Sequence, residues 1–131
     1  MKKASPLPEM FAALADPTRL RLLNLIAGRE VCVCYFVEIL RQSQPKISRH
    51  LAYLRRAGLV EARREGKWMH YRMAGKLDSE AQAVLTAVLA ALANDKQMQA
   101  DLTRFAHACC APQRLVMPEG VPAPRPVPQT A

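Results

Sequence analysis

Four cysteines occur in the chain, as two close pairs. Cys32 and Cys34 are separated by one valine, and Cys109 is followed directly by Cys110. Thiolates bind soft metal and metalloid ions and are also open to oxidation, so each pair is a candidate for either chemistry. The chain begins with two lysines but no long apolar run, unlike a secretory signal, so we expect a cytoplasmic protein with reduced thiols.

The segment that carries Cys32 and Cys34 changes from a β-prone run to a helical pattern near residue 36. In a regular helix, side chains two positions apart point roughly 200° from each other. Both thiols can therefore hold one ion only where the backbone is opened or not yet helical. We interpret them as ligands of a soft ion, with a relaxed helix without the ion and a distorted turn with it. The alternative is two small buried side chains of a core helix.

Two thiolates are few for one ion, and Cys109 or Cys110, at the end of the last predicted helix, can supply a third. The alternative for this second pair is a frayed helix end without a role. A redox switch based on Cys32 and Cys34 stays open. A thiol enzyme based on the second pair also stays open, although no phosphate-binding loop or positioned base surrounds it.

Residues 42–60 predict an amphipathic helix with a basic face. Ser43 or Gln44 can cap its start, and Gly58 ends it. Basic and polar side chains near a helix start can reach the phosphates and base edges of double-stranded DNA. The candidate DNA-binding residues of this helix are Gln44, Lys46, Ser48, Arg49, His50, Tyr53 and Arg56. The alternative is an ordinary solvated helix face.

The positive charge of the chain is concentrated in this helix and the segment that follows it. Residues 41–72 hold nine lysines and arginines against two glutamates, which is +7 of the formal net charge of +8 for the whole chain. A basic excess gathered on one helix and its neighbour is typical of a phosphate-binding face.

From Leu59 the apolar period changes to two, which predicts strands on either side of Gly66 and hence a β-hairpin. The predicted order of elements is that of a winged helix-turn-helix: a helix, a short polar turn, a basic helix and then a hairpin. Basic residues near the hairpin tip are candidates for contact with the DNA backbone: Arg63, Arg64 and Lys67. The alternative is a hairpin tip that only improves solubility.

Further helices are predicted over residues 5–15, 17–27, 77–93 and 95–110, so the fold class is mainly α with a small β-hairpin. In the second of these helices, Arg19 and Arg21 are expected to face solvent. The helix over 77–93 has a broad apolar face that a small domain cannot cover. We expect a second copy of the chain to cover it, giving a homodimer; the alternative is packing onto its own domain.

Domain boundaries follow from composition. We expect residues 1–111 to form one DNA-binding and dimerisation domain, and the proline-rich residues 112–131 to be a disordered tail. No stretch of the sequence approaches the roughly 20 apolar residues of a membrane span, so no membrane partner is expected.

Four segments, in the same order, resemble the ArsR/SmtB family, and more narrowly the arsenical-resistance repressors: 14–21 (LADPTRLR), 30–34 (EVCVC), 44–51 (QPKISRHL) and 64–68 (REGKW). The resemblance covers about residues 8–75. It implies a homodimeric winged-helix repressor that needs no cofactor to bind operator DNA. It further implies release when As(III) or Sb(III) binds the thiolates of Cys32 and Cys34.

The chain departs from the arsenical-resistance pattern at two positions. Some relatives carry a third cysteine where this chain has Val37, and Tyr35 replaces a residue that is usually acidic. The resemblance therefore leaves the third thiolate to Cys109 or Cys110, from the same or the other subunit. Zinc-responsive relatives use Asp and His ligands on the dimer helix, which has no histidine here. We expect His50 and His70 on the DNA face or the surface.

Overall fold

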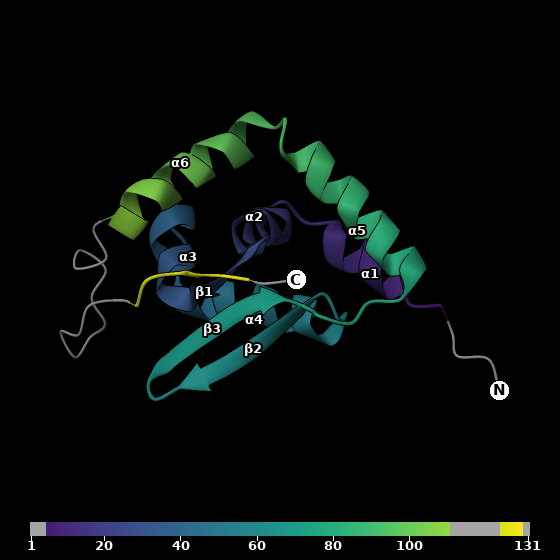
Figure 1. Cartoon of the computed structure of the whole chain (residues 1–131), viewed down its shortest axis with the longest axis horizontal. Coiled ribbons are helices and arrows are strands. Elements are labelled where there is room, and N and C mark those ends of the chain that lie inside the picture. The colour runs from purple at the N-terminus through teal and green to yellow at the C-terminus, as the bar shows by residue number, and fades with distance from the viewer. Residues whose placement is uncertain (1–4, 111–123, 130–131) are drawn as a thin grey trace.

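The computed structural model describes residues 5–110 and 124–129. Helices dominate the described part, and α5 and α6 lie along one side of the molecule while the β2–β3 hairpin lies on the opposite side (Figure 1). The elements in chain order are α1 (Leu7–Leu14), α2 (Pro17–Ile26), β1 (Arg29–Cys32), α3 (Val33–Leu40), α4 (Gln44–Arg56), β2 (Val60–Glu65), β3 (Trp68–Met73), α5 (Ser79–Leu92), α6 (Lys96–Cys110) and β4 (Val127–Pro128).

Local capping signals set the ends of the helices that matter for the site. The Asp16 carboxylate accepts a hydrogen bond from the Arg19 N–H at 3.0 Å, and Pro17 occupies the first turn of α2. The Ser43 hydroxyl caps α4 in the same way, accepting from the Lys46 N–H at 3.4 Å. Gly58 follows α4 with a φ of +79°, a conformation that glycine adopts without a Cβ clash.

The strands form one antiparallel sheet in the order β2-β3-β1-β4. The β2–β3 hairpin is paired from Val60↔Met73 to Glu65↔Trp68, and Gly66 turns the chain with a φ of +60°. β1 pairs with the other edge of β3. The predicted mainly α fold with a small hairpin is confirmed, and α3, the short turn, α4 and the hairpin form a winged helix-turn-helix.

The core lies between α2, α3, α4 and the sheet. The second half of α2 is buried around its whole circumference, because five successive residues, 22–26, are buried. The amphipathic pattern predicted for α4 is confirmed, because its apolar stripe of Ile47, Leu51 and Leu54 is buried. Large side chains that are fully buried include Leu22, Leu23, Leu25, Ile26, Tyr35, Phe36, Ile39, Ile47, Leu51 and Leu54. Because α4 packs this stripe directly against α2 and α3, its outer face is held rigidly toward solvent.

α6 is fastened to α2 by a buried ion pair, and the prediction that Arg21 faces solvent is wrong. Arg21 donates from Nε and Nη2 to the two carboxylate oxygens of Asp101, at 2.8 and 2.9 Å. The Asp101 side chain is fully buried, and its hydrogen bond raises the pKa of Arg21. The Gln97 amide also donates to Asp101 at 3.0 Å. The partners are 80 positions apart, so no local pattern reveals them.

Part of the proline-rich tail is ordered, so the prediction of disorder over 112–131 is wrong for residues 124–129. β4 pairs with β1, and Gln129 donates from its backbone to Gly28 O and from its side chain to Met73 O, each at 3.0 Å. The edge of β1 offers unpaired backbone groups that an extended chain can bind. Residues 112–123 and 130–131 lie outside the described part of the chain.

α5 keeps much of its apolar face open in the single chain. Ala81 and Leu85 are buried against α1 and α2, while four further apolar residues are only half-buried: Val84, Val88, Leu89 and Leu92. Within residues 5–110 and 124–129, no helix combines the length and apolar character needed to span a membrane.

Candidate thiol site and nucleic-acid interface

Cys32 and Cys34 lie at the junction of β1 and α3. Cys32 is the last residue of the strand and the extended N-cap of α3, and Cys34 is the second residue of the helix. The Cys34 thiol donates to the Cys32 sulfur with an Sγ–Sγ distance of 2.9 Å. The thiols converge because the chain changes from strand to helix between them. The prediction of a regular helix that must be distorted to bring them together is therefore wrong.

The two thiols differ in acidity. The hydrogen bond from Cys34 lowers the pKa of Cys32 and outweighs the opposing effect of burial. The same hydrogen bond, together with burial, raises the pKa of Cys34. Cys32 is therefore the thiol that ionises first, and Cys34 supplies the proton that stabilises its thiolate. Two neighbouring sulfurs, one of which has a lowered pKa, fit the donor set that a soft ion selects.

Aromatic packing joins this junction to α6. The Tyr35 ring, next to Cys34, stacks on the Phe105 ring with centroids 5.6 Å apart. The Arg29 guanidinium lies 5.1 Å from the same Phe105 centroid. Arg104 donates from Nη1 to Ile39 O at 3.2 Å, at the last turn of α3. The second half of α6 therefore lies beside the helix that carries Cys34.

The source of a third thiolate is outside what the structure describes. Cys109 and Cys110 belong to the last turn of α6, and their side chains are not among the described ones. Cys109 follows Phe105 by four positions, which is one helical repeat. Among the described side chains, no three His, Cys, Asp or Glu residues converge where a metal ion could be held.

His70 is buried beside Cys32, so its predicted place at the surface is wrong. Its exposure is only 6%, and in the sheet it stands directly opposite Cys32. Its Nε2 has no hydrogen-bond partner within the described part of the chain. The hairpin pattern could not show this burial, because β3 becomes an inner strand only through its long-range pairing with β1.

The outer face of α4 carries the predicted DNA-binding side chains. Gln44, Lys46, Ser48, Arg49 and Arg56 are exposed, and His50 and Tyr53 are half-buried. These two half-buried side chains line an open hollow of about 560 Å³ with Lys46, Arg49, Arg56 and Arg19. A concave surface with this many cationic groups matches the charge of a nucleic-acid backbone.

Arg19 belongs to this face, and the prediction that it faces solvent is wrong. It reaches from α2 to α4, where its guanidinium lies 4.1 Å from the Tyr53 ring centroid. Its Nη1 donates to His50 Nδ1 at 3.3 Å, and its Nε donates to Ala13 O at 2.7 Å. The contact with His50 joins residues 31 positions apart, so the helical period of α2 alone did not reveal this role.

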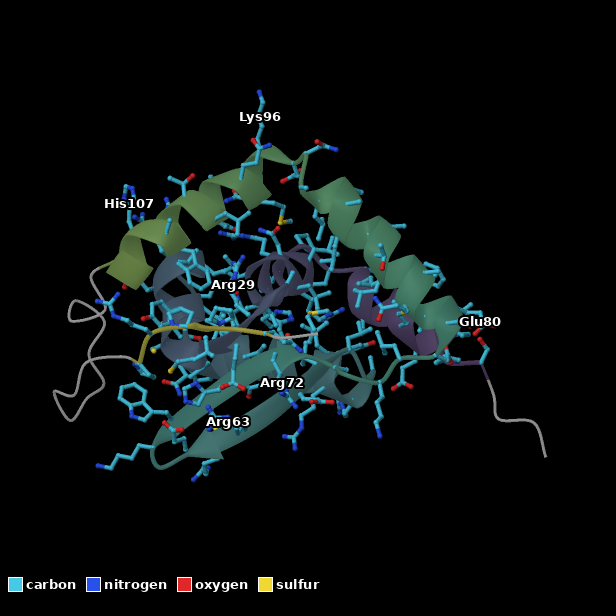
Figure 2. All side chains as sticks on the ribbon, in the orientation of Figure 1. Arg29, Arg63, Arg72, Glu80, Lys96 and His107 are labelled. Atoms are coloured by element: carbon cyan, nitrogen blue, oxygen red, sulfur yellow. The ribbon has the colours of Figure 1, made fainter. Side chains whose placement is uncertain are left out.

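The three basic residues near the hairpin tip have different surroundings. Arg64 and Lys67 are exposed. Arg63 (labelled on the hairpin in Figure 2) donates from Nη2 to Glu30 Oε1 at 2.6 Å and from Nη1 to Glu65 Oε2 at 2.9 Å. These bonds raise the pKa of Arg63 and lower the pKa values of Glu30 and Glu65. Two carboxylates therefore already balance the charge of Arg63.

Comparisons with known proteins agree on one family. Residues 16–62 match the family described as "Bacterial regulatory protein, arsR family". The chain is 43% identical over 107 residues to the arsenic resistance transcriptional regulator ArsR1 of Pseudomonas putida, covering 81% of this chain and 82% of that one. It is 46% identical over 78 residues to the arsenical resistance operon repressor of Escherichia coli, covering 59% and 67%.

Among solved structures, HlyU from Vibrio cholerae is similar with a TM-score of 0.56 at 30% identity. The match covers 63% of this chain and 87% of HlyU. The family match contains Cys32, Cys34 and all of α4, so the thiol pair and this helix both lie within the matched segment. The two relatives above carry the names of transcriptional regulators rather than enzymes.

Proposed function

Because the chain belongs to the arsR family of bacterial regulatory proteins, which are winged-helix transcriptional regulators, we propose that it represses a metalloid-resistance operon. In this proposal a homodimer holds operator DNA until As(III) or Sb(III) binds the thiolates of Cys32 and Cys34. The observation that carries the proposal is the 2.9 Å contact between two thiols at the start of α3, the helix that packs on α4.

DNA binding is proposed for the exposed face of α4 and the hairpin. Lys46, Arg49 and Arg56 would contact phosphates, while the polar groups of Gln44, Ser48, His50 and Tyr53 would reach base edges and sugars. Arg64 and Lys67 would hold the backbone from the wing. Neither surface contains the thiols, so DNA binding would require no cofactor.

The homodimer is proposed to form through α1 and α5. These helices pack side by side (Figure 1), and Phe11 of α1 is 53% exposed although it is a large apolar residue. Together with the half-buried apolar residues of α5, it forms a face that a second copy would cover. A two-fold dimer would present its recognition helices about one helical turn of DNA apart, roughly 34–36 Å.

The sensing step is ligand exchange without a change of oxidation state. Each thiol of Cys32 and Cys34 would replace one hydroxyl of arsenite, and the thiol proton and the hydroxyl would leave together as water. Cys109 or Cys110 would supply a third thiolate, from the same or the other subunit. The bound ion would shift the start of α3, and α4 would move with it because the two helices are packed together.

Fluorescence anisotropy of a labelled operator fragment tests this proposal. Arsenite or antimonite should release the wild-type protein, and Cys34→Ser should bind the fragment but stay bound when arsenite is added. Cadmium and zinc are tested in parallel, because thiolates also bind these ions. If saturating arsenite left operator binding of the wild-type dimer unchanged, the proposal would be wrong.

A redox switch is the second candidate, since the contact between Cys32 and Cys34 also suits thiol oxidation. In that case peroxide, in the presence of a chelator and without metalloid, would release the operator. Release that requires arsenite and is absent with peroxide excludes this alternative.

A further inference from the structure

An ion pair ties the wing to the strand that carries Cys32. β3 lies between β1 and β2, and Arg63 of β2 reaches across it to Glu30 of β1. Arg63 Nη2 donates to Glu30 Oε1 at 2.6 Å, and Arg63 Nε donates to the two carboxylate oxygens at 3.2 and 3.4 Å. A guanidinium that binds a carboxylate through two nitrogens sets orientation as well as distance. The two strands are therefore coupled in position although they do not pair with each other.

The strand register places this ion pair on the same face of the sheet as Cys32. His70 of β3 is paired with Cys32 on one side and with Arg63 on the other, so the three residues form one row across the sheet. Side chains directly opposite one another in a sheet project from the same face. Glu30 precedes Cys32 by two positions on β1 and therefore shares that face.

The surroundings of the pair favour a fixed contact. The Glu30 side chain is only 13% exposed, whereas that of Arg63 is 48% exposed. Glu65 holds the remaining Nη1 of Arg63. Arg63, which the sequence indicated as a DNA contact, thus directs its guanidinium to carboxylates of its own chain.

We propose that Glu30 and Arg63 are positioning residues that transmit occupancy of the Cys32–Cys34 thiol pair to the wing. This inference rests on the proposed function. When an ion binds both sulfurs, the hydrogen bond from Cys34 to Cys32 is replaced by two bonds to the ion. Ion binding therefore changes the positions of the Cys32 and Cys34 side chains relative to each other.

The end of β1 is the part that moves, because Cys32 is its last residue. Glu30 moves with the strand, and its contact with Arg63 carries the displacement to β2. Arg64, next to Arg63 near the wing tip, then leaves its position on the DNA backbone. Shifts below 1 Å have large effects where a packed contact has two alternative arrangements. The wing thus provides a route to release in addition to the packing of α3 on α4.

The experiment measures how strongly arsenite weakens operator binding when the ion pair is broken. The variants are Glu30→Gln, Arg63→Gln, the double variant and Arg63→Lys. The matched control is Glu61→Gln, which breaks the 3.1 Å ion pair with Arg72 on the same hairpin and leaves Glu30 and Arg63 unchanged. For each protein, operator Kd is measured by anisotropy with and without saturating arsenite. Arsenite binding is followed separately by the ultraviolet absorption of arsenic–sulfur bonds.

We expect each Gln variant to bind arsenite but to reduce the ratio of the two Kd values at least about fivefold, with no further reduction in the double variant. The ratio of the two Kd values should fall less in Arg63→Lys than in Arg63→Gln. In Glu61→Gln this ratio should stay within about twofold of the wild-type value. Thermal melts by circular dichroism verify that each variant is folded. If Glu30→Gln does not fold, Arg63→Gln and Arg63→Lys test the same contact.

Two results would overturn this inference alone. In the first, both single Gln variants keep the wild-type ratio of operator Kd with arsenite to operator Kd without it. In the second, the fold-reduction of this ratio in the double variant equals the product of the fold-reductions in the two single variants. Both leave the proposed function standing, because wild-type protein still responds to arsenite. Absence of release from the wild-type protein is a different outcome, and it removes the proposed function on which the inference rests.

Discussion

The guanidinium of Arg19 lies 4.1 Å from the centre of the Tyr53 ring, so a side chain of α2 holds a side chain of the recognition helix in place. Arg56 lies over the same ring at 5.6 Å. Two guanidinium groups therefore lie near the Tyr53 ring, and His50 accepts a hydrogen bond from that of Arg19. This arrangement orders the half-buried part of the proposed DNA face in the absence of DNA, which should lower the entropic cost of binding.

Arg19→Ala should weaken operator binding because it removes the cation–π contact and the bond to His50. We expect a loss of about 1–2 kcal/mol, roughly 5–30-fold in Kd. Anisotropy at fixed salt measures it. Lys96→Ala is the matched control: it also removes one positive charge, but Lys96 lies on the opposite side of the molecule from Arg63 and the wing (Figure 2). Equal losses in the two variants would show that net charge alone matters.

Arg49→Ala should also weaken operator binding, because Arg49 is exposed on the same face and is proposed to contact a phosphate. The slope of log Kd against the logarithm of the salt concentration should also become smaller by about one unit. Titrations at four or more salt concentrations measure the slope. An unchanged slope together with an unchanged Kd would place Arg49 outside the DNA contact.

Cys34→Ala should raise the pKa of Cys32, since the hydrogen bond from Cys34 is what lowers it. At a pH just below the ordinary thiol pKa of about 8.5, the wild-type protein should therefore hold more thiolate than the variant. Ultraviolet absorbance of the thiolate against pH measures this difference. Cys34→Ser is the control, because a serine hydroxyl can still donate to the Cys32 sulfur and should preserve part of the effect.

Asp101→Asn should destabilise the protein strongly, because it leaves Arg21 without the carboxylate that neutralises it inside the α2–α6 contact. Removing one partner of a buried ion pair costs about 3–5 kcal/mol, and partial exposure of Arg21 places the expected loss near the lower end. Urea unfolding measures it. Glu80→Gln, on the exposed start of α5, removes a carboxylate of the same charge and should change stability by less than about 0.5 kcal/mol.

Leu89→Glu should convert the proposed homodimer to a monomer, because a charge on the half-buried face of α5 cannot be covered by a second copy. Sedimentation velocity measures the oligomeric state. Ala90→Glu is the matched control, since Ala90 is the next residue along the helix and is exposed. A monomeric wild-type protein, or a dimer in both variants, would contradict dimerisation through this face.

The sequence by itself determined the elements and the basic face of α4. The start of α2 at residue 17, the turn at Gly66 and the amphipathic pattern of α4 were all predicted, because caps, turns and periodicity depend on residues within a few positions of one another. The spacing of Cys32 and Cys34 also predicted that they can share an ion only outside a regular helix.

Only the tertiary structure decided which partners the charged and buried groups find. Arg21 meets Asp101, Arg63 meets Glu30, and His70 is buried opposite Cys32. Each of these contacts joins residues that are at least 33 positions apart. Such contacts follow from how helices and strands pack against one another. The few residues on either side of a charged side chain do not show whether it will face solvent or form an ion pair. The convergence of the two thiols likewise depends on where β1 ends, and the pairing of β1 with β3 sets that position.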